Sequence, residues 1–108
     1  MDKTTEHKEP KCRLESDLLG ELQIPADAYY GVQTQRGINN YKISTVKMYD
    51  YPDFIIAYAY VKKAAALANA EAGALDSHIA QAIAAAADEV IAGKLWDNFP
   101  IDMMQGGA

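Results

Sequence analysis

The chain has 108 residues, of which half are hydrophobic and 23% are charged, a composition that excludes a disordered chain and suits one domain-sized core. Its formal net charge of -5 argues against binding to nucleic acid or an anionic membrane, because both partners require a basic surface. No signal peptide or membrane-spanning stretch stands out, and Cys12, the single cysteine, cannot form an intrachain disulfide. A reducing, cytoplasmic setting is the expected localisation.

The first part of the chain predicts a leader, a hairpin and a short helix. Residues 1–12 are polar, and we expect them to form a flexible leader. The stretch that follows, "RLESDLLGELQIP", loosely alternates between apolar and polar residues on both sides of Gly20, and Pro25 ends the pattern. This arrangement predicts a small β hairpin with its turn near Gly20. A short helix is expected between Gly31 and Asn40.

A long alanine-rich helix is expected next. Asp50 is the predicted N-cap and Pro52 falls in the first turn, where its missing N–H costs little. About five turns follow, and Gly73 supplies a left-handed end. Apolar residues repeat at helical spacing, and their neighbours are also apolar, which predicts a helix buried on most sides except near Lys62 and Lys63. The repeating residues are Phe54, Tyr58, Val61, Ala65 and Ala68.

A second helix is predicted from Asp76 or Ser77 to Gly93. Its predicted apolar stripe consists of Ile79, Ile83, Ala86 and Val90. The short connection "GALD" makes the two helices a helical hairpin, in which facing alanines allow close approach. The predicted fold is therefore mainly α: a helical hairpin, a short helix and a small N-terminal β hairpin. These elements leave much apolar surface uncovered, so we expect them to pack against something beyond this sequence.

Few residues carry a recognisable pattern of catalytic or metal-binding chemistry. His7 and His78 are spaced neither as metal ligands nor as a base beside a nucleophile, so no metal site is predicted. Cys12 has no histidine nearby in any expected element and is interpreted as an incidental thiol. Asp88 and Glu89 are adjacent and point in different directions on a helix, which favours surface charge over a paired-carboxylate site.

Three other features are ambiguous from the residues alone. Arg36 follows polar side chains that could orient its guanidinium toward a carboxylate ligand, although a salt bridge or a capping role is the favoured interpretation. The paired tyrosines favour packing over ligand stacking. The glycine pair Gly106–Gly107 after Gln105 is typical of a turn, and also of a loop whose backbone binds an anion.

Several long stretches together resemble one known family. In order and spacing, "DLLGELQIPADAYYGVQTQRGINNY", "VKKAAALANAEAG", "AIAAAADEVIAGK" and "NFPIDMMQGGA" are similar to the N-terminal region of the aspartase/fumarase superfamily. The resemblance covers Arg13 to Ala108. Within the superfamily, "PADAYYGVQTQR" and "FPIDMMQGGA" are most similar to the aspartate ammonia-lyases.

The resemblance implies that residues 13–108 are a truncated first domain, without the central helical bundle and the C-terminal domain. It implies a homotetrameric enzyme that acts on a dicarboxylate substrate, L-aspartate, and reversibly releases fumarate and ammonia without an organic cofactor. The family's catalytic segments would follow Ala108, so no catalytic residue is assigned in this chain and the chain alone is expected to be inactive. Gln105, Gly106 and Gly107 match the lead-in to the first substrate-contacting segment.

Two other interpretations remain open. The first is another lyase of the superfamily, such as fumarate hydratase or an enzyme acting on a succinyl-type substrate. The second is a non-catalytic helical module whose exposed apolar faces bind another helix.

Overall fold

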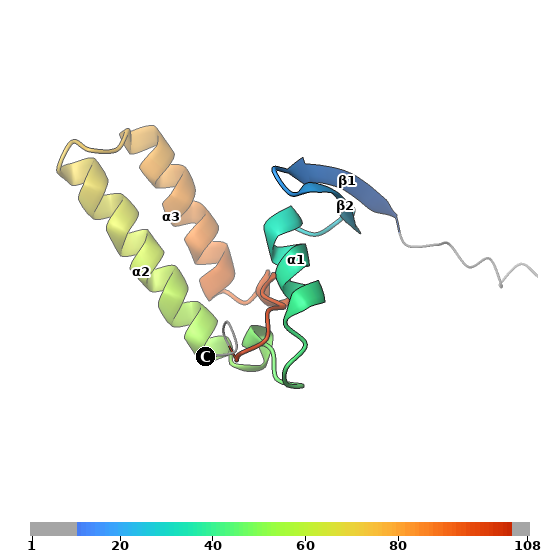
Figure 1. Ribbon diagram of the computed structural model, residues 1–108. Helices are drawn as coiled ribbons and strands as arrows, with labels where there is room; N and C mark the ends of the chain where they lie inside the picture. Colours follow the sequence, from blue (N-terminus) through green and yellow to red (C-terminus); the bar gives the residue numbers. More distant parts are fainter. Residues whose placement is uncertain (1–10, 105–108) are drawn as a thin grey trace, which may run out of the picture. The chain divides into compact units, whose positions relative to one another are not determined.

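The computed structural model describes residues 11–104, so the leader up to Pro10, His7 and the predicted lead-in Gln105–Gly107 lie outside the described residues. The chain divides into two compact units, residues 1–40 and 41–108. The elements, in chain order, are β1 (Cys12–Asp17), β2 (Gly20–Pro25), α1 (Val32–Asn40), the 3₁₀ turn η1 (Met48–Asp50), α2 (Pro52–Glu71), α3 (Ser77–Ile91) and the 3₁₀ turn η2 (Trp96–Asn98) (Figure 1).

The predicted fold class is confirmed. The described part of the chain is mainly α, with a helical hairpin, a short helix and one two-stranded antiparallel sheet. Within the described residues, no helix combines the length and the apolar character needed to cross a membrane.

The β hairpin forms where the alternating pattern predicts it. β1 and β2 pair from Cys12 opposite Pro25 to Asp17 opposite Gly20, which leaves a two-residue turn at Leu18 and Leu19. Gly20 has a φ of +121°, a backbone conformation that residues with a Cβ rarely adopt. The Asp17 carboxylate accepts a hydrogen bond from the Leu19 N–H at 2.9 Å and thereby stabilises the turn.

Arg13 connects the hairpin to helix α1 within the first unit. Its guanidinium donates to four backbone carbonyls between the last residue of β2 and the start of α1, and its Nε lies 2.6 Å from the Glu15 carboxylate. The four carbonyls belong to Pro25, Ala26, Ala28 and Tyr30, at 2.7 to 3.3 Å. Ile24 of β2 and Val32 of α1, on either side of this segment, are the buried hydrophobic residues in the described part of the first unit. One side chain therefore orders a connection that has no regular secondary structure.

Helices α2 and α3 form the helical hairpin of the second unit (Figure 1). The predicted signals at the turn are confirmed: Gly73 has a φ of +80°, and the Asp76 carboxylate caps α3 by accepting the His78 N–H at 2.8 Å. Gly93, after α3, has a φ of +89°. These signals act through neighbouring backbone groups, which explains why the sequence alone could locate them.

The start of α2 differs from the prediction. Asp50 does not cap α2; it ends η1, where its carboxylate accepts the Lys47 N–H at 2.9 Å. Tyr51 takes the N-cap position without a side-chain hydrogen bond, and Pro52 is in the first turn as expected. The Asp50 side chain therefore caps the start of the 3₁₀ turn that precedes α2, and not the start of α2 itself.

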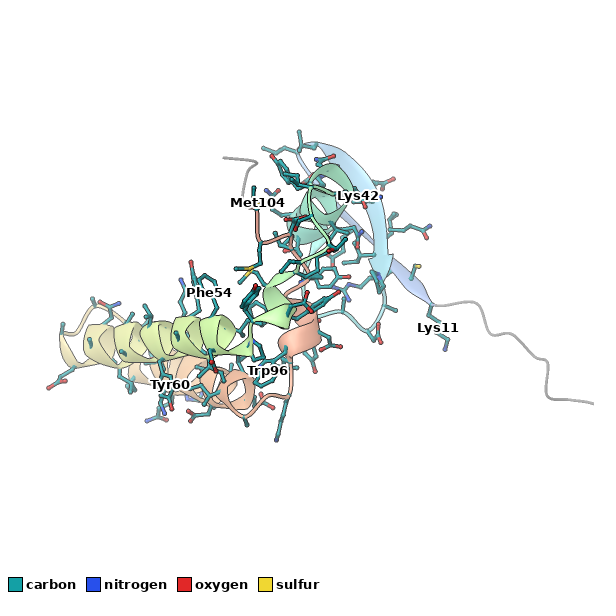
Figure 2. The ribbon with its side chains drawn as sticks, turned by 90° about the horizontal axis from the view of Figure 1, so that it is seen from below. Lys11, Lys42, Phe54, Tyr60, Trp96 and Met104 are labelled. Carbon is teal, nitrogen blue, oxygen red and sulfur yellow. The ribbon has the colours of Figure 1, made fainter. Side chains whose placement is uncertain are left out.

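The predicted apolar faces of both long helices are wrong for the described structure. The residues buried between them are mainly alanine: Ile55, Ala59 and Ala66 of α2, and Ala80 and Ala87 of α3. Most of the predicted stripe residues, including Phe54, Tyr58, Val61, Ile79 and Ile83, are exposed. Figure 2 labels Phe54, one of these exposed side chains. Small side chains permit closely spaced helices, and the close spacing leaves the larger side chains at the edges of the contact. Thus α2 is not buried on most sides.

Candidate functional site

The segment that leads to the predicted substrate loop is held against an earlier part of the same unit. After η2, the chain runs antiparallel to residues 46–48, with Lys47 opposite Asp102 in an isolated β bridge. The Met48 N–H donates to the Ile101 carbonyl at 2.9 Å, and the Met103 N–H donates to the Val46 carbonyl at 3.0 Å. Backbone hydrogen bonds therefore fix the path of the chain just before residue 105.

Asp102 is the centre of this contact. Its Oδ2 accepts the N–H groups of Ile43 and Ser44 at 3.1 and 2.6 Å. Its Oδ1 accepts the Ser44 hydroxyl at 2.9 Å and the Met104 N–H at 2.8 Å. The side chain is completely buried, and the Lys47 ammonium lies 3.8 Å from Oδ2. Among the described residues it is the one buried polar or charged side chain.

These contacts determine the chemistry open to Asp102. The backbone hydrogen bonds from Ser44 and Met104, with smaller contributions from the Ser44 hydroxyl and the Ile43 N–H, outweigh the effect of burial and lower the pKa of Asp102 to about 2. Four donors occupy both oxygens, and so weak a base is poorly matched to proton transfer near neutral pH. Asp102 is thus suited to holding backbone rather than to reacting with a substrate.

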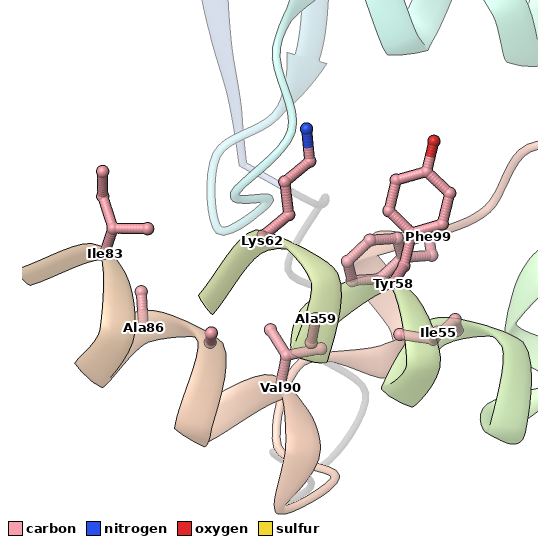
Figure 3. Close-up of a pocket in the computed structure, with 9 residues that line it drawn as sticks. Ile55, Tyr58, Ala59, Lys62, Ile83, Ala86, Val90 and Phe99 are labelled. Carbon is pink, nitrogen blue, oxygen red and sulfur yellow. The ribbon is translucent and has the colours of Figure 1, made fainter. Parts of the chain in front are cut away.

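An apolar groove lies along the helical hairpin. It encloses about 350 Å³. Figure 3 shows side chains from α2 and α3 around it, together with Phe99 from the following segment. The lining residues are Ile55, Tyr58, Ala59, Lys62, Ile83, Ala86, Ala87, Val90 and Phe99. Lys62 is the single ionisable side chain apart from Tyr58, so this groove suits an apolar surface better than a dicarboxylate.

Arg36 has a structural role within the first unit, as the favoured interpretation predicts. Its guanidinium makes two hydrogen bonds to the Asp17 carboxylate, at 2.7 and 3.2 Å, and one to the Gly20 carbonyl at 3.0 Å. The side-chain hydrogen bond from Arg36 is the main cause that lowers the pKa of Asp17. The donors of Arg36 are therefore directed to the end of the β hairpin rather than to a ligand.

The other candidates are distributed along the described chain without converging. Asp88 pairs with Lys63 at 2.7 Å on the surface, which confirms the surface-charge interpretation of this acidic pair. The N–H of His78 donates to the cap of α3, and Cys12 is exposed on β1. Between residues 11 and 104, no group of three or more histidine, cysteine, aspartate or glutamate side chains is arranged to hold a metal ion.

Two residues with several hydrogen bonds each were not predicted. Arg13 and Asp102 each hold a connecting segment, yet their partners lie far along the chain, up to 59 residues away for Asp102. The signal available for Asp102 was one acidic residue among Pro100, Ile101, Met103 and Met104. A charged residue within an apolar segment is costly to bury unless it is hydrogen-bonded, which implies hydrogen-bond donors around this position.

Comparison with known proteins agrees with this fold. A family model described as "Lyase" matches residues 20–108. The aspartate ammonia-lyase of Escherichia coli (strain K12) is 53% identical over 97 residues, which cover 89% of this chain and 20% of the relative. The class II fumarate hydratase of Halobacterium salinarum is also 53% identical, over 96 residues that cover 89% of this chain and 20% of the relative.

A solved structure gives the same result. The fumarate lyase:delta crystallin from Brucella melitensis superimposes with a TM-score of 0.82 at 45% identity, covering 91% of this chain and 21% of that chain. The present chain thus spans about a fifth of the length of the curated relatives that it matches. With the family model covering most of its residues, the chain belongs to this lyase family, the aspartase/fumarase superfamily.

Proposed function

We propose that the protein to which this chain belongs is an aspartate ammonia-lyase. The observation that carries the proposal is that aspartate ammonia-lyases from several bacteria are 48% to 53% identical over most of this chain, together with the ending "FPIDMMQGGA", which is most similar to that group. The reaction removes the C3 proton of L-aspartate and breaks the bond between C2 and nitrogen. A double bond forms, and the products are fumarate and ammonia.

Within that enzyme, residues 13–108 act as the N-terminal domain and the polar residues before them act as a flexible leader, except Cys12, which pairs with Pro25 at the start of β1. Gln105, Gly106 and Gly107 lead into the first segment that contacts the dicarboxylate substrate. The catalytic base and the groups that stabilise the developing carboxylate charge lie on segments beyond Ala108, where preorganised donors can meet that charge. The saturated carboxylate of Asp102 and the engaged guanidinium of Arg36 support a scaffolding role for this domain.

The proposed assembly is a cytoplasmic homotetramer that needs no organic cofactor. The apolar groove on the helical hairpin supports a domain that packs against the remaining parts of the same polypeptide. In such an assembly the exposed tyrosine and isoleucine side chains of α2 and α3 are covered by other helices.

The full-length enzyme tests this function with two substrates. Purified protein incubated with L-aspartate should increase the ultraviolet absorbance of fumarate, while L-malate should give little or none. Because a fumarate hydratase is equally similar over this chain, malate is the necessary comparison. Turnover of malate without turnover of aspartate would identify a fumarate hydratase instead. Inactivity with both would favour another lyase of the superfamily.

A further inference from the structure

We propose that Asp102 is a positioning residue, which fixes the point where the chain leaves the helical unit toward the substrate-contacting segment. This inference rests on the proposed function, because it concerns the same site. Asp102 does not touch the substrate in this proposal. It acts through the backbone of residues 103 and 104, which immediately precede Gln105.

The contacts of Asp102 connect two segments that are distant in sequence. One oxygen accepts two N–H groups at positions 43 and 44, and the other accepts the Met104 N–H at 2.8 Å. The Ser44 hydroxyl adds a third contact from the first segment: its single proton is shared between Asp102 Oδ1 at 2.9 Å and the Val46 carbonyl at 3.2 Å. We call residues 102–104 the exit segment. A buried carboxylate with these partners restricts the exit segment to a single position against residues 43–46.

The helical hairpin does not depend on these contacts. Ile55, Ala59 and Ala66 of α2 pack with Ala80 and Ala87 of α3, and none of these residues is bonded to Asp102. Loss of the carboxylate should therefore free the exit segment while α2 and α3 remain paired. A structural effect on the exit can be separated from a general loss of stability.

Both carboxylate oxygens of Asp102 must accept hydrogen bonds at this position. In Asp102→Asn, the amide NH₂ would face backbone N–H groups or the Ser44 hydroxyl, so at least one buried donor loses its partner. Asp102→Glu keeps the charge and both acceptors but extends them by one methylene group. Asp97→Asn is the matched control, because Asp97 is five residues earlier, exposed, and bonded to Asn98 at 3.4 Å.

The experiment measures steady-state kinetics of the full-length enzyme with L-aspartate for the wild type and the three variants. For Asp102→Asn we expect kcat/KM to fall about 10- to 100-fold, mostly through a higher KM, because a misplaced binding segment loses substrate contacts. Asp102→Glu should recover part of this loss, and Asp97→Asn should match the wild type. Assays are run at a temperature where circular dichroism shows that every variant is folded.

Hydrogen exchange of the same full-length proteins provides a readout that does not depend on turnover. In Asp102→Asn the amides of Met103 and Met104 should exchange at least about tenfold faster, a change that corresponds to about 1.4 kcal/mol in local opening, while the α3 amides keep their rates. Equal acceleration in α3 would show a general loss of stability and overturn the proposal.

The two failures are distinguishable. A wild-type enzyme without activity on aspartate would refute the proposed function, and the exchange pattern would still decide whether Asp102 holds the exit segment. An active wild type with unchanged kinetic constants in Asp102→Asn would overturn the positioning role, whatever the melting temperature does.

Discussion

Two carboxylates among residues 11–104, those of Asp17 and Asp102, have a lowered pKa for different reasons. At Asp17 the main cause is the hydrogen bond from the Arg36 side chain, and at Asp102 it is the hydrogen bond from the Ser44 backbone. Asp17 and Arg36 are both partly exposed, so salt weakens their attraction. Asp102 is completely buried, and its fixed backbone donors are not screened in this way.

The Asp102 carboxylate makes stability depend on pH in a defined range. Its pKa falls from an ordinary 3.8 to about 2 on folding, so its contribution to stability is present above pH 3.8 and is lost as the pH falls through about 2. We predict that the urea midpoint of the wild-type full-length protein exceeds that of Asp102→Asn at pH 6, and that the difference shrinks as the pH is lowered toward 2. A difference that stayed constant over this range would contradict the assignment.

At the scale of the element, the ends of the helices are determined by glycines in two different environments. Gly73 and Gly93 both have a positive φ. A Cβ added at Gly73 would meet nothing within 4 Å, whereas one at Gly93 would lie 3.3 Å from the Trp96 ring. The Trp96 indole donates to the Val90 carbonyl at 2.8 Å, so the ring is not free to move away. Close approach and backbone conformation therefore both require glycine at position 93.

This difference predicts unequal effects of two alanine substitutions. Gly73→Ala should cost about 1 kcal/mol, the penalty of a left-handed alanine. Gly93→Ala should cost about 2 kcal/mol or more, because the new methyl group also presses against Trp96. Native-state hydrogen exchange at Ala74 and Lys94, whose amides close the two helix ends, measures the local opening free energies. Equal losses at the two sites would show that the Trp96 contact is unimportant.

On the scale of the whole molecule, much apolar surface is exposed in each unit. The most exposed large apolar side chains on the helical hairpin are Val61, Tyr60, Tyr58 and Ile79, and Leu18 and Leu19 are exposed at the β hairpin of the first unit. The buried core of the described residues consists of seven hydrophobic side chains, four of which are alanine. A core of such small residues provides little hydrophobic stabilisation, so additional packing partners are expected.

The isolated 108-residue chain should therefore associate with itself and show no aspartate turnover. In sedimentation velocity its average mass should rise with concentration, because association buries exposed apolar side chains. The double variant Val61→Gln and Ile83→Gln removes one exposed group from each long helix and should shift the distribution toward monomer. A stable monomer at all concentrations would instead favour the self-contained helical interaction module.

The local sequence was sufficient to predict the two strands and three helices of the described residues and most of their ends, but not the 3₁₀ turns η1 and η2. The residues that end or cap these elements act on backbone groups only a few positions away, so their effect can be predicted without knowledge of the fold. They are Gly20, Gly73, Gly93 and Asp76. The resemblance to the superfamily was equally available, since it is carried by long ordered segments.

Only the tertiary structure decided which faces are buried and which polar residues matter. In helices made largely of alanine, several faces have similar hydrophobicity, and the choice among them depends on how closely two backbones approach. Asp102 accepts hydrogen bonds from residues 58 and 59 positions away, and no spacing rule in the sequence predicts such a pairing. Local preferences act over a few residues, whereas burial and buried charge are determined by contacts between distant segments.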